Sequence, residues 1–395
     1  MTDAELLTSR EAATLANVKI NTLTGWVRDG DLDVAARVGR TYRFRREDIE
    51  ACITKRSQGT VKENARLVED MGEKVLERFG ATALDKVYEP QVRWSYDTMP
   101  PKSPGVPMLM LSDIHYGEVV EFDETLQSNQ FDLAICEERI RQVFTTTVEL
   151  LQIHMAAPQY TGIVLILGGD MVSGSLHEDQ LVTDEAAPIE QALGVSQIIS
   201  DGIAFLADEF AKVTVYCVPG NHGRTTRKPR AKFYAQTNLD WLAYKLIENH
   251  CRALANVEIN CPPVRDLTFS VAGRRYRLTH GDQFRGGDGI IGPIGPIMRG
   301  DTRKRLAANL MPGGAQEYDT MLCGHFHTLL MLPRLIVNGS VKGYDEYALS
   351  INVPFELPQQ ALWIVHPKYG HTYHMPVLCN NGNPDYRDII EVTLD

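Results

Sequence analysis

Five short blocks of the sequence carry side chains of the types that bind metal ions. They are Asp113-Ile114-His115, Gly169-Asp170, Gly220-Asn221-His222, His280-Gly281-Asp282 and Gly324-His325-Phe326-His327. Three of the blocks follow apolar, strand-like runs at residues 108–111, 163–167 and 213–218. Because α/β proteins place their chemistry where strands run out into loops, we expect these polar side chains to gather at one edge of a sheet.

The donor types indicate which ions could bind. Imidazole together with carboxylate suits zinc, iron, manganese or nickel, whereas oxygen ligands alone would suit magnesium or calcium. In an extended segment, residues two apart share a face, so Asp113 with His115, and His325 with His327, could each hold one ion. Seven donors are too many for one ion. Two ions about 3.5 to 4 Å apart, bridged by a carboxylate and sharing a nucleophilic hydroxide, are common in phosphate ester hydrolysis. Asp170 is the expected bridge, because the glycines before it allow a close approach.

In order and spacing the five blocks resemble those of the calcineurin-like metallophosphoesterase superfamily, over about residues 107–378. The resemblance implies a four-layer α/β/β/α sandwich, in which two mixed β-sheets face each other with helices outside. It also implies two divalent transition metal ions, with manganese favoured over zinc, iron or nickel. The ligands implied for the first ion are Asp113, His115, Asp170 and His327, and those for the second are Asp170, Asn221, His280 and His325.

The same resemblance implies that His222 is catalytic together with Asp170. His222 would contact the scissile phosphate and protonate the leaving oxygen, and histidine suits such work near neutral pH. The sequence departs from the family at one position, because the family usually has Asp or Glu after the Asn-His pair and this chain has Gly223. The carboxylate that would orient His222 must come from elsewhere or be missing. Asp282 either supports a histidine ligand or packs within its loop.

The N-terminal segment has the pattern of a small DNA-binding domain. A capping box at Thr8-Ser9-Arg10-Glu11 predicts a helix through Ala16, and a second helix is expected at about residues 21–28. A hairpin within residues 34–44 and a further helix from residue 46 follow.

This segment, about residues 6–56, resembles the MerR-like and excisionase-like winged helix-turn-helix domains. The resemblance implies that Thr22, Thr24 and Arg28 face the major groove, with Arg37, Arg40, Arg43 and Arg45 near phosphates. The alternative is a folding or protein-docking unit whose arginines form a solvated surface. Gly25 inside the second helix weakens the DNA-binding interpretation, since glycine there costs about 1 kcal/mol relative to alanine.

Two further segments lie beside the predicted site. Arg224, Arg227, Lys228 and Arg230 crowd a loop that begins next to His222. They either grip the phosphates of a polyanionic substrate, which their position favours, or form an exposed run of charge. Residues 285–300 are rich in Gly and Pro, and they predict either a lid or a disordered insert.

We divide the chain into a domain at residues 1–56, a linker at 57–106 and a catalytic domain at 107–395. The linker combines an amphipathic helix at about residues 57–82 with a proline-rich segment at 89–107. The helix either docks on the catalytic domain or pairs two chains in a homodimer. Segments 332–337, 361–365 and 371–377 are expected to be strands that close the second sheet.

Composition adds limits on location and charge. The net charge of −11 argues against a basic coat over the whole chain, although DNA contact depends on local patches. Seven irregularly spaced cysteines suggest reduced thiols. The first residues lack the features of a signal peptide and no apolar run approaches bilayer-spanning length, so a cytoplasmic protein without membrane contact is expected.

The sequence therefore predicts a two-metal phosphoesterase acting on nucleic acid, as a DNA phosphodiesterase or nuclease. One alternative is a phosphomonoesterase or small-nucleotide phosphodiesterase that uses its N-terminal module for docking. A second alternative is a DNA-binding regulator with a vestigial or sensory metal site.

Overall fold

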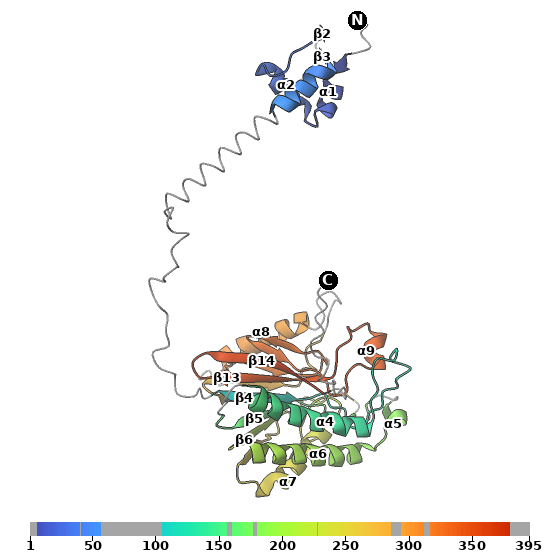
Figure 1. Cartoon of the computed structure of the whole chain (residues 1–395). Coiled ribbons are helices and arrows are strands. Elements are labelled where there is room, and N and C mark those ends of the chain that lie inside the picture. The colour runs from blue at the N-terminus through green and yellow to red at the C-terminus, as the bar shows by residue number, and fades with distance from the viewer. Residues whose placement is uncertain are drawn as a thin grey trace. The chain divides into compact units, whose positions relative to one another are not determined.

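The computed structural model describes residues 6–39, 41–56, 105–155, 160–176, 180–226, 228–285, 294–311 and 317–379. The chain divides into two compact units, Met1–Asp97 and Thr98–Asp395 (Figure 1). The predicted linker helix and nearly all of the proline-rich segment fall outside the described residues, as do Arg40 and Arg227.

The N-terminal unit has the predicted helices and hairpin. Helix α1 (Ser9–Leu15) begins with the capping box, in which the Glu11 amide donates to Thr8 Oγ1 and the Thr8 amide donates to the Glu11 carboxylate. Its other elements are β1 (Leu7–Thr8), α2 (Ile20–Arg28), β2 (Ala36–Val38), β3 (Thr41–Phe44) and a helix at residues 46–56. The strands pair antiparallel in the order β1-β3-β2. Leu23, Phe44 and Ile49 are almost fully buried in a core that belongs to this unit alone.

The first sheet of the catalytic unit has six strands in the order β14-β13-β4-β5-β6-β7. Strands β4 (Val106–Leu111), β5 (Ile163–Leu167), β6 (Val213–Cys217) and β7 (Val257–Asn260) are parallel. Strands β13 (Gln359–His366) and β14 (Gly370–Leu378) extend the sheet antiparallel beyond β4. The expectation that these last two strands close the second sheet is therefore wrong. Strand β13 is apolar on both faces, which suits a position inside a covered sheet.

The second sheet has five strands in the order β11-β12-β10-β9-β8. They are β8 (Asp266–Val271), β9 (Arg274–Thr279), β10 (Thr320–Cys323), β11 (Leu330–Leu332) and β12 (Leu335–Val337). The pair β10 and β9 and the pair β10 and β12 are parallel, so this sheet is mixed, as the first one is.

Alternation of side chains along the strands defines four layers. Leu109 and Leu111 of β4 pack in the cluster formed with α4 (Leu133–Val148), α6 (Pro188–Glu209) and α7 (Leu239–His250). Met108 and Met110 of the same strand point the other way, into a cluster shared by the two sheets. The outer face of the second sheet packs against Ile297 of α8 (Ile294–Leu310). Figure 1 shows α4, α6 and α7 on one side of the sheets and α8 on the other, which is the predicted α/β/β/α sandwich.

Short helices complete the catalytic unit: a π-helix at Glu149–His154, α5 (Gln180–Thr183), a 3₁₀ helix at Cys251–Ala253 and α9 (Glu346–Ser350). Residues 294–300, expected to belong to a loop, form the first turns of α8. Within the described parts of the chain, none of the helices is both long and apolar enough to span a bilayer.

Candidate metal centre

Each candidate ligand lies just beyond the end of a strand. Asp113 follows β4, Asp170 follows β5 and Asn221 follows β6, all at the carboxyl ends of parallel strands. His280 directly follows β9, and His325 follows the neighbouring strand β10. The two sheets thus present their loops at a common edge, where chemistry is expected in open α/β sheets.

The ligand loops have a strained backbone. Five of the proposed ligands have positive φ: 54° at Asp113 and His115, 51° at Asp170 and His327, and 72° at His325. A residue other than glycine held in such a conformation costs of the order of 1–3 kcal/mol and persists only where its surroundings enforce it. Here the amides of Ile114 and His115 both donate to the Asp170 carbonyl, at 2.9 and 3.1 Å, so the loops after β4 and β5 hold each other.

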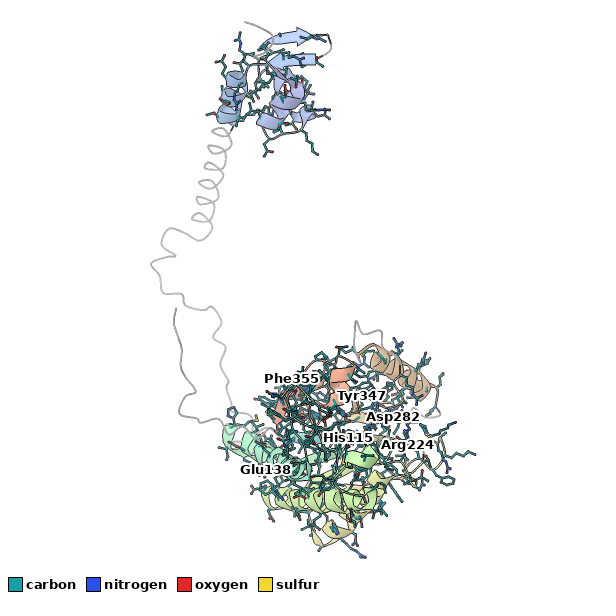
Figure 2. The ribbon with its side chains drawn as sticks, turned by 90° about the vertical axis from the view of Figure 1, so that its right-hand side faces the viewer. His115, Glu138, Arg224, Asp282, Tyr347 and Phe355 are labelled. Carbon is teal, nitrogen blue, oxygen red and sulfur yellow. The ribbon has the colours of Figure 1, made fainter. Side chains whose placement is uncertain are left out.

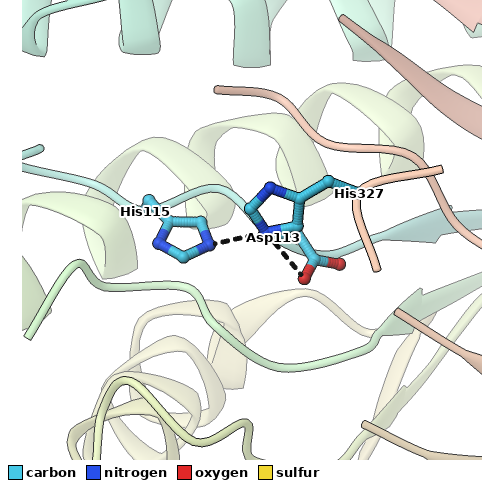
Figure 3. Close-up of side chains that lie close together, drawn as sticks. All are labelled: Asp113, His115 and His327. Atoms are coloured by element: carbon cyan, nitrogen blue, oxygen red, sulfur yellow. Dashed lines mark hydrogen bonds and ion pairs between the residues drawn. The ribbon is translucent and has the colours of Figure 1, made fainter. Parts of the chain in front are cut away.

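The side chains of the five blocks come together in overlapping clusters. The first contains Asp113, His115 and His327 (Figure 3). His115 Nε2 and His327 Nε2 are 3.1 Å apart, and His327 Nε2 lies 3.5 Å from Asp113 Oδ1. In the second cluster, which contains Asp170, His280 and His325, His280 Nε2 lies 2.8 Å from Asp170 Oδ2 and 3.1 Å from Asn221 Oδ1.

These positions correct one part of the sequence analysis. His325 and His327 belong to different clusters, whereas extended geometry suggested that the two could hold one ion together. Asp113 and His115 do lie in one cluster, but with left-handed rather than extended backbone. A third grouping, Asp170 with His115 and His222, connects the two clusters.

The donor set fits divalent metal ions. Ligand atoms about 2.1 Å from one ion, at the angles of tetrahedral or octahedral coordination, are roughly 3.0 to 3.4 Å apart. The distances of 2.8 to 3.5 Å between donors of the two clusters are close to that range. The chemistry of the donors also fits, since four imidazoles accompany two buried carboxylates and one amide.

Electrostatics favour a cation at this site. Burial lowers the pKa of His115 to about 4 and that of His325 also to about 4, so both rings are neutral and keep a lone pair for a metal. Burial opposes the charge of His280, but Asp170 and Asp113 raise its pKa to about 10. Burial also raises the pKa of Asp113 to about 7. Burial therefore opposes ionisation of Asp113, and of Asp170 as well, but His280 holds the pKa of Asp170 below its usual value; divalent ions would supply positive charge to both carboxylates.

Polar contacts on the far side of the rings orient them: a hydrogen bond at His280 and a carboxylate contact at His115. His280 Nδ1 lies 2.9 Å from the Gly168 carbonyl, which accepts a hydrogen bond from it. The other ring nitrogen, Nε2, is thereby left for the metal. His115 Nδ1 lies 3.1 Å from Glu118 Oε2, in a carboxylate–histidine pair of the kind common at metal sites. Glu118 in turn contacts Lys342 Nζ at 2.7 Å, and Lys342 also pairs with Asp345.

His222 lies against both clusters. Its amide donates to Asp170 Oδ1 at 2.7 Å, and its ring centroid is 4.5 Å from that of His115. Its Nδ1 lies 3.0 Å from the Ser173 carbonyl and 3.2 Å from the Gln180 side-chain amide. The Ser173 carbonyl can only accept, so Nδ1 donates this hydrogen bond, and the Gln180 amide nitrogen, itself a donor, is a close neighbour of Nδ1 rather than its acceptor. A backbone oxygen thus orients this ring.

Sequence reasoning missed several buried residues around the ligands. Asp240 of α7 accepts hydrogen bonds from the Asp170 amide at 2.9 Å and the Gly220 amide at 2.8 Å. Glu118 and Lys342 support His115 from two separate segments. Nothing near these residues in the sequence indicates a site; the departure at Gly223 indicated only that a carboxylate comes from elsewhere or is missing.

Of the described basic residues in the predicted loop, Arg224 lies beside the site. A cavity of about 340 Å³ beside the second cluster is lined by Asn221, Arg224, Asp282, Phe284, Arg285 and His325. Figure 2 shows Arg224 and Asp282 in the same part of the catalytic unit as His115. Lys228 and Arg230 are exposed and do not line this cavity. Arg285, at the start of the glycine-rich segment, was missed as a candidate substrate contact, and Asp282 pairs with Arg265 at 2.5 Å.

The candidate DNA contacts of the N-terminal unit lie mainly on its surface. Thr22, Thr24 and Arg28 are exposed on α2, and the Thr24 hydroxyl donates to the Ile20 carbonyl of its own helix. Arg37 and Arg45 are exposed in and after the hairpin, whereas Arg43 is half-buried and Arg40 lies outside the described residues.

Comparison with known proteins agrees with the fold. A four-layer sandwich with metal-ligand types at the loop edge between its sheets defines a metal-dependent phosphoesterase. The family model for calcineurin-like phosphoesterases matches residues 106–306, just over half of the chain, and the chain belongs to that family. A helix-turn-helix domain model matches residues 6–57. No curated protein matches the chain.

The solved structures found similar to this chain share little sequence identity with it. Vacuolar Protein Sorting 29 from Cryptosporidium parvum is 14% identical, with a TM-score of 0.28, and the match covers 66% of this chain and 86% of that one. Wild-type Vps29 complexed with zinc from Entamoeba histolytica is 12% identical, with a TM-score of 0.28 and coverage of 69% and 99%. Phosphopantetheinyl hydrolase from Mycobacterium tuberculosis is 11% identical, with a TM-score of 0.26 and coverage of 64% and 94%.

Proposed function

We propose that this chain is a metal-dependent phosphodiesterase or nuclease that acts on DNA. The observation that carries the proposal is the presence of a helix-turn-helix domain in the same chain as a phosphoesterase domain. The exposed threonines and arginine of α2 supply the polar surface that base and phosphate contacts need. Binding of this domain to DNA would raise the concentration of phosphodiesters near the catalytic unit without any contact between the units.

Each site residue has a proposed part in the reaction. Asp113, His115 and His327 would hold one ion, Asn221, His280 and His325 would hold the other, and Asp170 would bridge them. Divalent ions at these positions acidify water and neutralise the phosphoryl oxygens. His222, with Nδ1 held by the Ser173 carbonyl at 3.0 Å, would act as a doubly protonated imidazolium, giving its Nε2 proton to the leaving oxygen and remaining as the neutral ring.

The cavity beside the second cluster favours an anionic substrate. Arg224 and Arg285 both line it, next to Asn221 and His325, so two guanidinium groups are close to the proposed reaction centre. Guanidinium groups bind phosphate oxygens in a bidentate geometry that suits a phosphate flanking the scissile one. A chain of phosphodiesters offers such a flanking phosphate, whereas a phosphomonoester does not.

The first experiment tests the chemistry with Asp170→Asn and His222→Ala. Both variants are expected to lose at least about a hundredfold of Mn²⁺-dependent turnover of a nitrophenyl phosphodiester: His222→Ala because one acid or base group usually contributes that much, and Asp170→Asn because the proposed bridging carboxylate is lost. Metal analysis separates their roles, because Asp170→Asn should bind less manganese while His222→Ala keeps the wild-type content. His154→Ala, at an exposed position, is the matched control. Full activity in both site variants would refute the mechanism.

The second experiment identifies the substrate class. Turnover would be compared among a nitrophenyl monoester, a nitrophenyl diester, small cyclic nucleotides, and labelled single-stranded and double-stranded DNA. DNA is expected to have the highest kcat/KM. Preference for the monoester or for cyclic nucleotides would contradict the DNA proposal and leave the metal-dependent chemistry intact.

A further inference from the structure

The residue after the Asn-His pair has no room for a side chain. A Cβ atom at Gly223 would lie 2.5 Å from Asn238 Oδ1 and 2.9 Å from both the amide nitrogen and Oδ1 of Asp240. Real Cβ contacts are essentially never shorter than 3.0 Å, so a larger residue here would displace these groups. The position at which the resembling family usually carries Asp or Glu is therefore occupied, in this chain, by the first turn of α7.

Asp240 brings a carboxylate to that place. Its side chain is fully buried, and it accepts hydrogen bonds from four backbone amides. Oδ2 accepts from Asp170 at 2.9 Å and from Gly220 at 2.8 Å, and Oδ1 accepts from Met171 at 3.1 Å and Val172 at 3.4 Å. Hydrogen bonds to an ionised acceptor are roughly twice as strong as neutral ones. One carboxylate thus holds the loop after β5 and the loop after β6 together.

Asn238 completes the connection. It caps α7, because its Oδ1 accepts from the Asp240 amide at 2.8 Å, and its Nδ2 donates to the Gly220 carbonyl at 2.7 Å. The Leu239 amide donates to the Gly223 carbonyl at 2.6 Å. The start of α7 is thereby bonded to the backbone on both sides of Asn221 and His222.

The two loops that Asp240 joins carry three of the proposed functional residues. Asp170 lies on one, Asn221 and His222 lie on the other, and the His222 amide donates to Asp170 Oδ1. Close packing leaves little freedom, since a Cβ at Gly220 would lie 2.1 Å from Asp170 Oδ1. Small displacements of either loop would therefore change the distance between Asp170 and Asn221.

We infer that Asp240 is a positioning residue: its carboxylate, carried on α7, lies where the family usually has Asp or Glu after the Asn-His pair, and it holds the backbone of the two ligand loops, while the Ser173 carbonyl orients the His222 ring. It does not contact the metals or the substrate. It fixes the spacing of the loops that bear Asp170 and Asn221 before metal binds. The inference rests on the metal-dependent chemistry of the proposed function, and it is independent of whether the substrate is DNA.

The test uses the full-length protein with Asp240→Asn. Each carboxylate oxygen of Asp240 accepts from two backbone amides. In the variant, the side-chain NH₂ group would replace one of these oxygens, so two backbone amides would lack an acceptor. Mn²⁺ titration without substrate is expected to show about a tenfold to hundredfold loss of affinity, which is the usual effect of removing a group that supports metal ligands. Amide hydrogen exchange at residues 170–172 and 220 should be faster in the metal-free variant. With the nitrophenyl diester, kcat should fall while KM stays constant. Asp208→Asn, at an exposed position on α6, is the control.

A second variant tests the same contact from the other side. Gly223→Ala keeps the Asp240 carboxylate but pushes a Cβ against it, so it should also weaken Mn²⁺ binding and accelerate exchange at residues 170–172. Circular dichroism establishes whether each variant is folded. Wild-type Mn²⁺ affinity in either folded variant would overturn the inference. Loss of Mn²⁺ affinity in both would support it, even if the wild-type protein cleaves no DNA.

Discussion

Lys342 is a buried cation next to the metal centre, and its neighbours explain why it is retained there. Its side chain is 4% exposed. Its Nζ pairs with Glu118 and Asp345, and Glu118 holds the His115 ring from the opposite side. Burial opposes the charge of Lys342, but Glu118 and Asp345 raise its pKa above the usual range. Lys342 thus holds Glu118 in place, and Glu118 contacts the His115 ring, which faces His327.

Replacement of Lys342 by methionine should be strongly destabilising. Breaking a buried ion pair leaves an uncompensated charge, and such changes cost about 3–5 kcal/mol. Lys342→Met leaves Glu118 and Asp345 without this partner, so the free energy of unfolding of the metal-free protein should fall by about that amount in a urea titration. Lys245→Met is the control, because Lys245 pairs with Glu248 at 2.8 Å on the surface, where a pair contributes about 0–1 kcal/mol. Equal losses in the two variants would contradict this view of Lys342.

At the scale of residues, the side-chain types in the sequence indicated the metal-ligand clusters, whereas the backbone conformation of the ligands could not be predicted. Imidazoles and carboxylates at strand ends indicated the clusters, because few other arrangements bring these types together at such spacing. The left-handed backbone at Asp113 and His115 could not be predicted, since it depends on hydrogen bonds from the loop after β4 to the Asp170 carbonyl. Asp240 has no local signal either, because its partners lie about 20 to 70 residues earlier in the chain.

At the scale of elements, two helical glycines illustrate opposite packing situations. A Cβ at Gly202 of α6 would lie 2.2 Å from the Phe144 ring of α4, so Gly202 allows these two helices to approach. A Cβ at Gly25 of α2 would meet nothing within 4 Å. Glycine at position 25 therefore lowers helix stability without a packing reason, and its conformation does not require glycine.

The two glycine-to-alanine variants should shift stability in opposite directions. Gly202→Ala overpacks the helix layer, which typically costs about 1–3 kcal/mol, so the catalytic unit should melt at a lower temperature. Gly25→Ala should stabilise the N-terminal unit by about 0.5–1 kcal/mol. Calorimetry of the full chain measures the melting temperatures of both units. A separate scan of residues 1–56 alone identifies the transition that belongs to the N-terminal unit. Destabilisation by Gly25→Ala would show that α2 needs glycine for a reason other than packing.

A half-buried histidine on β14 should make stability depend on pH. His371 Nε2 lies 2.8 Å from the Tyr276 hydroxyl of β9, which joins the two sheets. Burial, followed by the neighbouring His374, lowers the pKa of His371 to about 4. The pKa of histidine in an unfolded chain is about 6.5, so between these values the unfolded state binds more protons than the folded state. The contribution of His371 is complete above about pH 6.5 and is lost as the pH falls toward 4.

His371→Gln removes this titration. The fall in unfolding free energy of the metal-free protein between pH 7 and pH 5 should therefore be smaller in His371→Gln than in the wild type. The exposed-site variant His154→Gln should behave as the wild type does. Urea titrations at the two pH values provide the comparison, and an unchanged difference in His371→Gln would refute the assignment.

The positions of the strands along the chain could be predicted better than which strands pair with each other. Apolar runs at residues 108–111, 163–167 and 213–218 correspond to β4, β5 and β6, because a buried parallel strand is apolar on both faces. The strands at residues 361–365 and 371–377 were also expected, but they were assigned to the wrong sheet. Pairing of β13 with β4 joins segments about 250 residues apart, and apolar pattern alone does not identify such a partner.

At the scale of the whole molecule, charge and domain organisation have separate consequences. The chain carries a net charge of −11, so any affinity for DNA must come from local groups rather than from the total. The N-terminal unit has its own hydrophobic core and divides from the rest by its contacts. The core clusters of the catalytic unit likewise consist of its own residues, so the tethering proposal can be tested with a fragment that lacks the N-terminal unit.

Removal of the N-terminal unit should affect DNA and small substrates differently. The fragment at residues 98–395 is expected to match the full chain in kcat and KM for a nitrophenyl diester, since the predicted metal ligands all lie within it. For DNA at low salt, its KM should be at least about tenfold higher, because the tether no longer raises the local concentration of substrate. The difference should shrink as salt increases, since phosphate contacts weaken steeply with ionic strength. Arg28→Ala in the full chain should reproduce part of the effect. If the fragment cleaves DNA with the KM of the full chain at every salt concentration, the helix-turn-helix unit does not deliver DNA to the catalytic site.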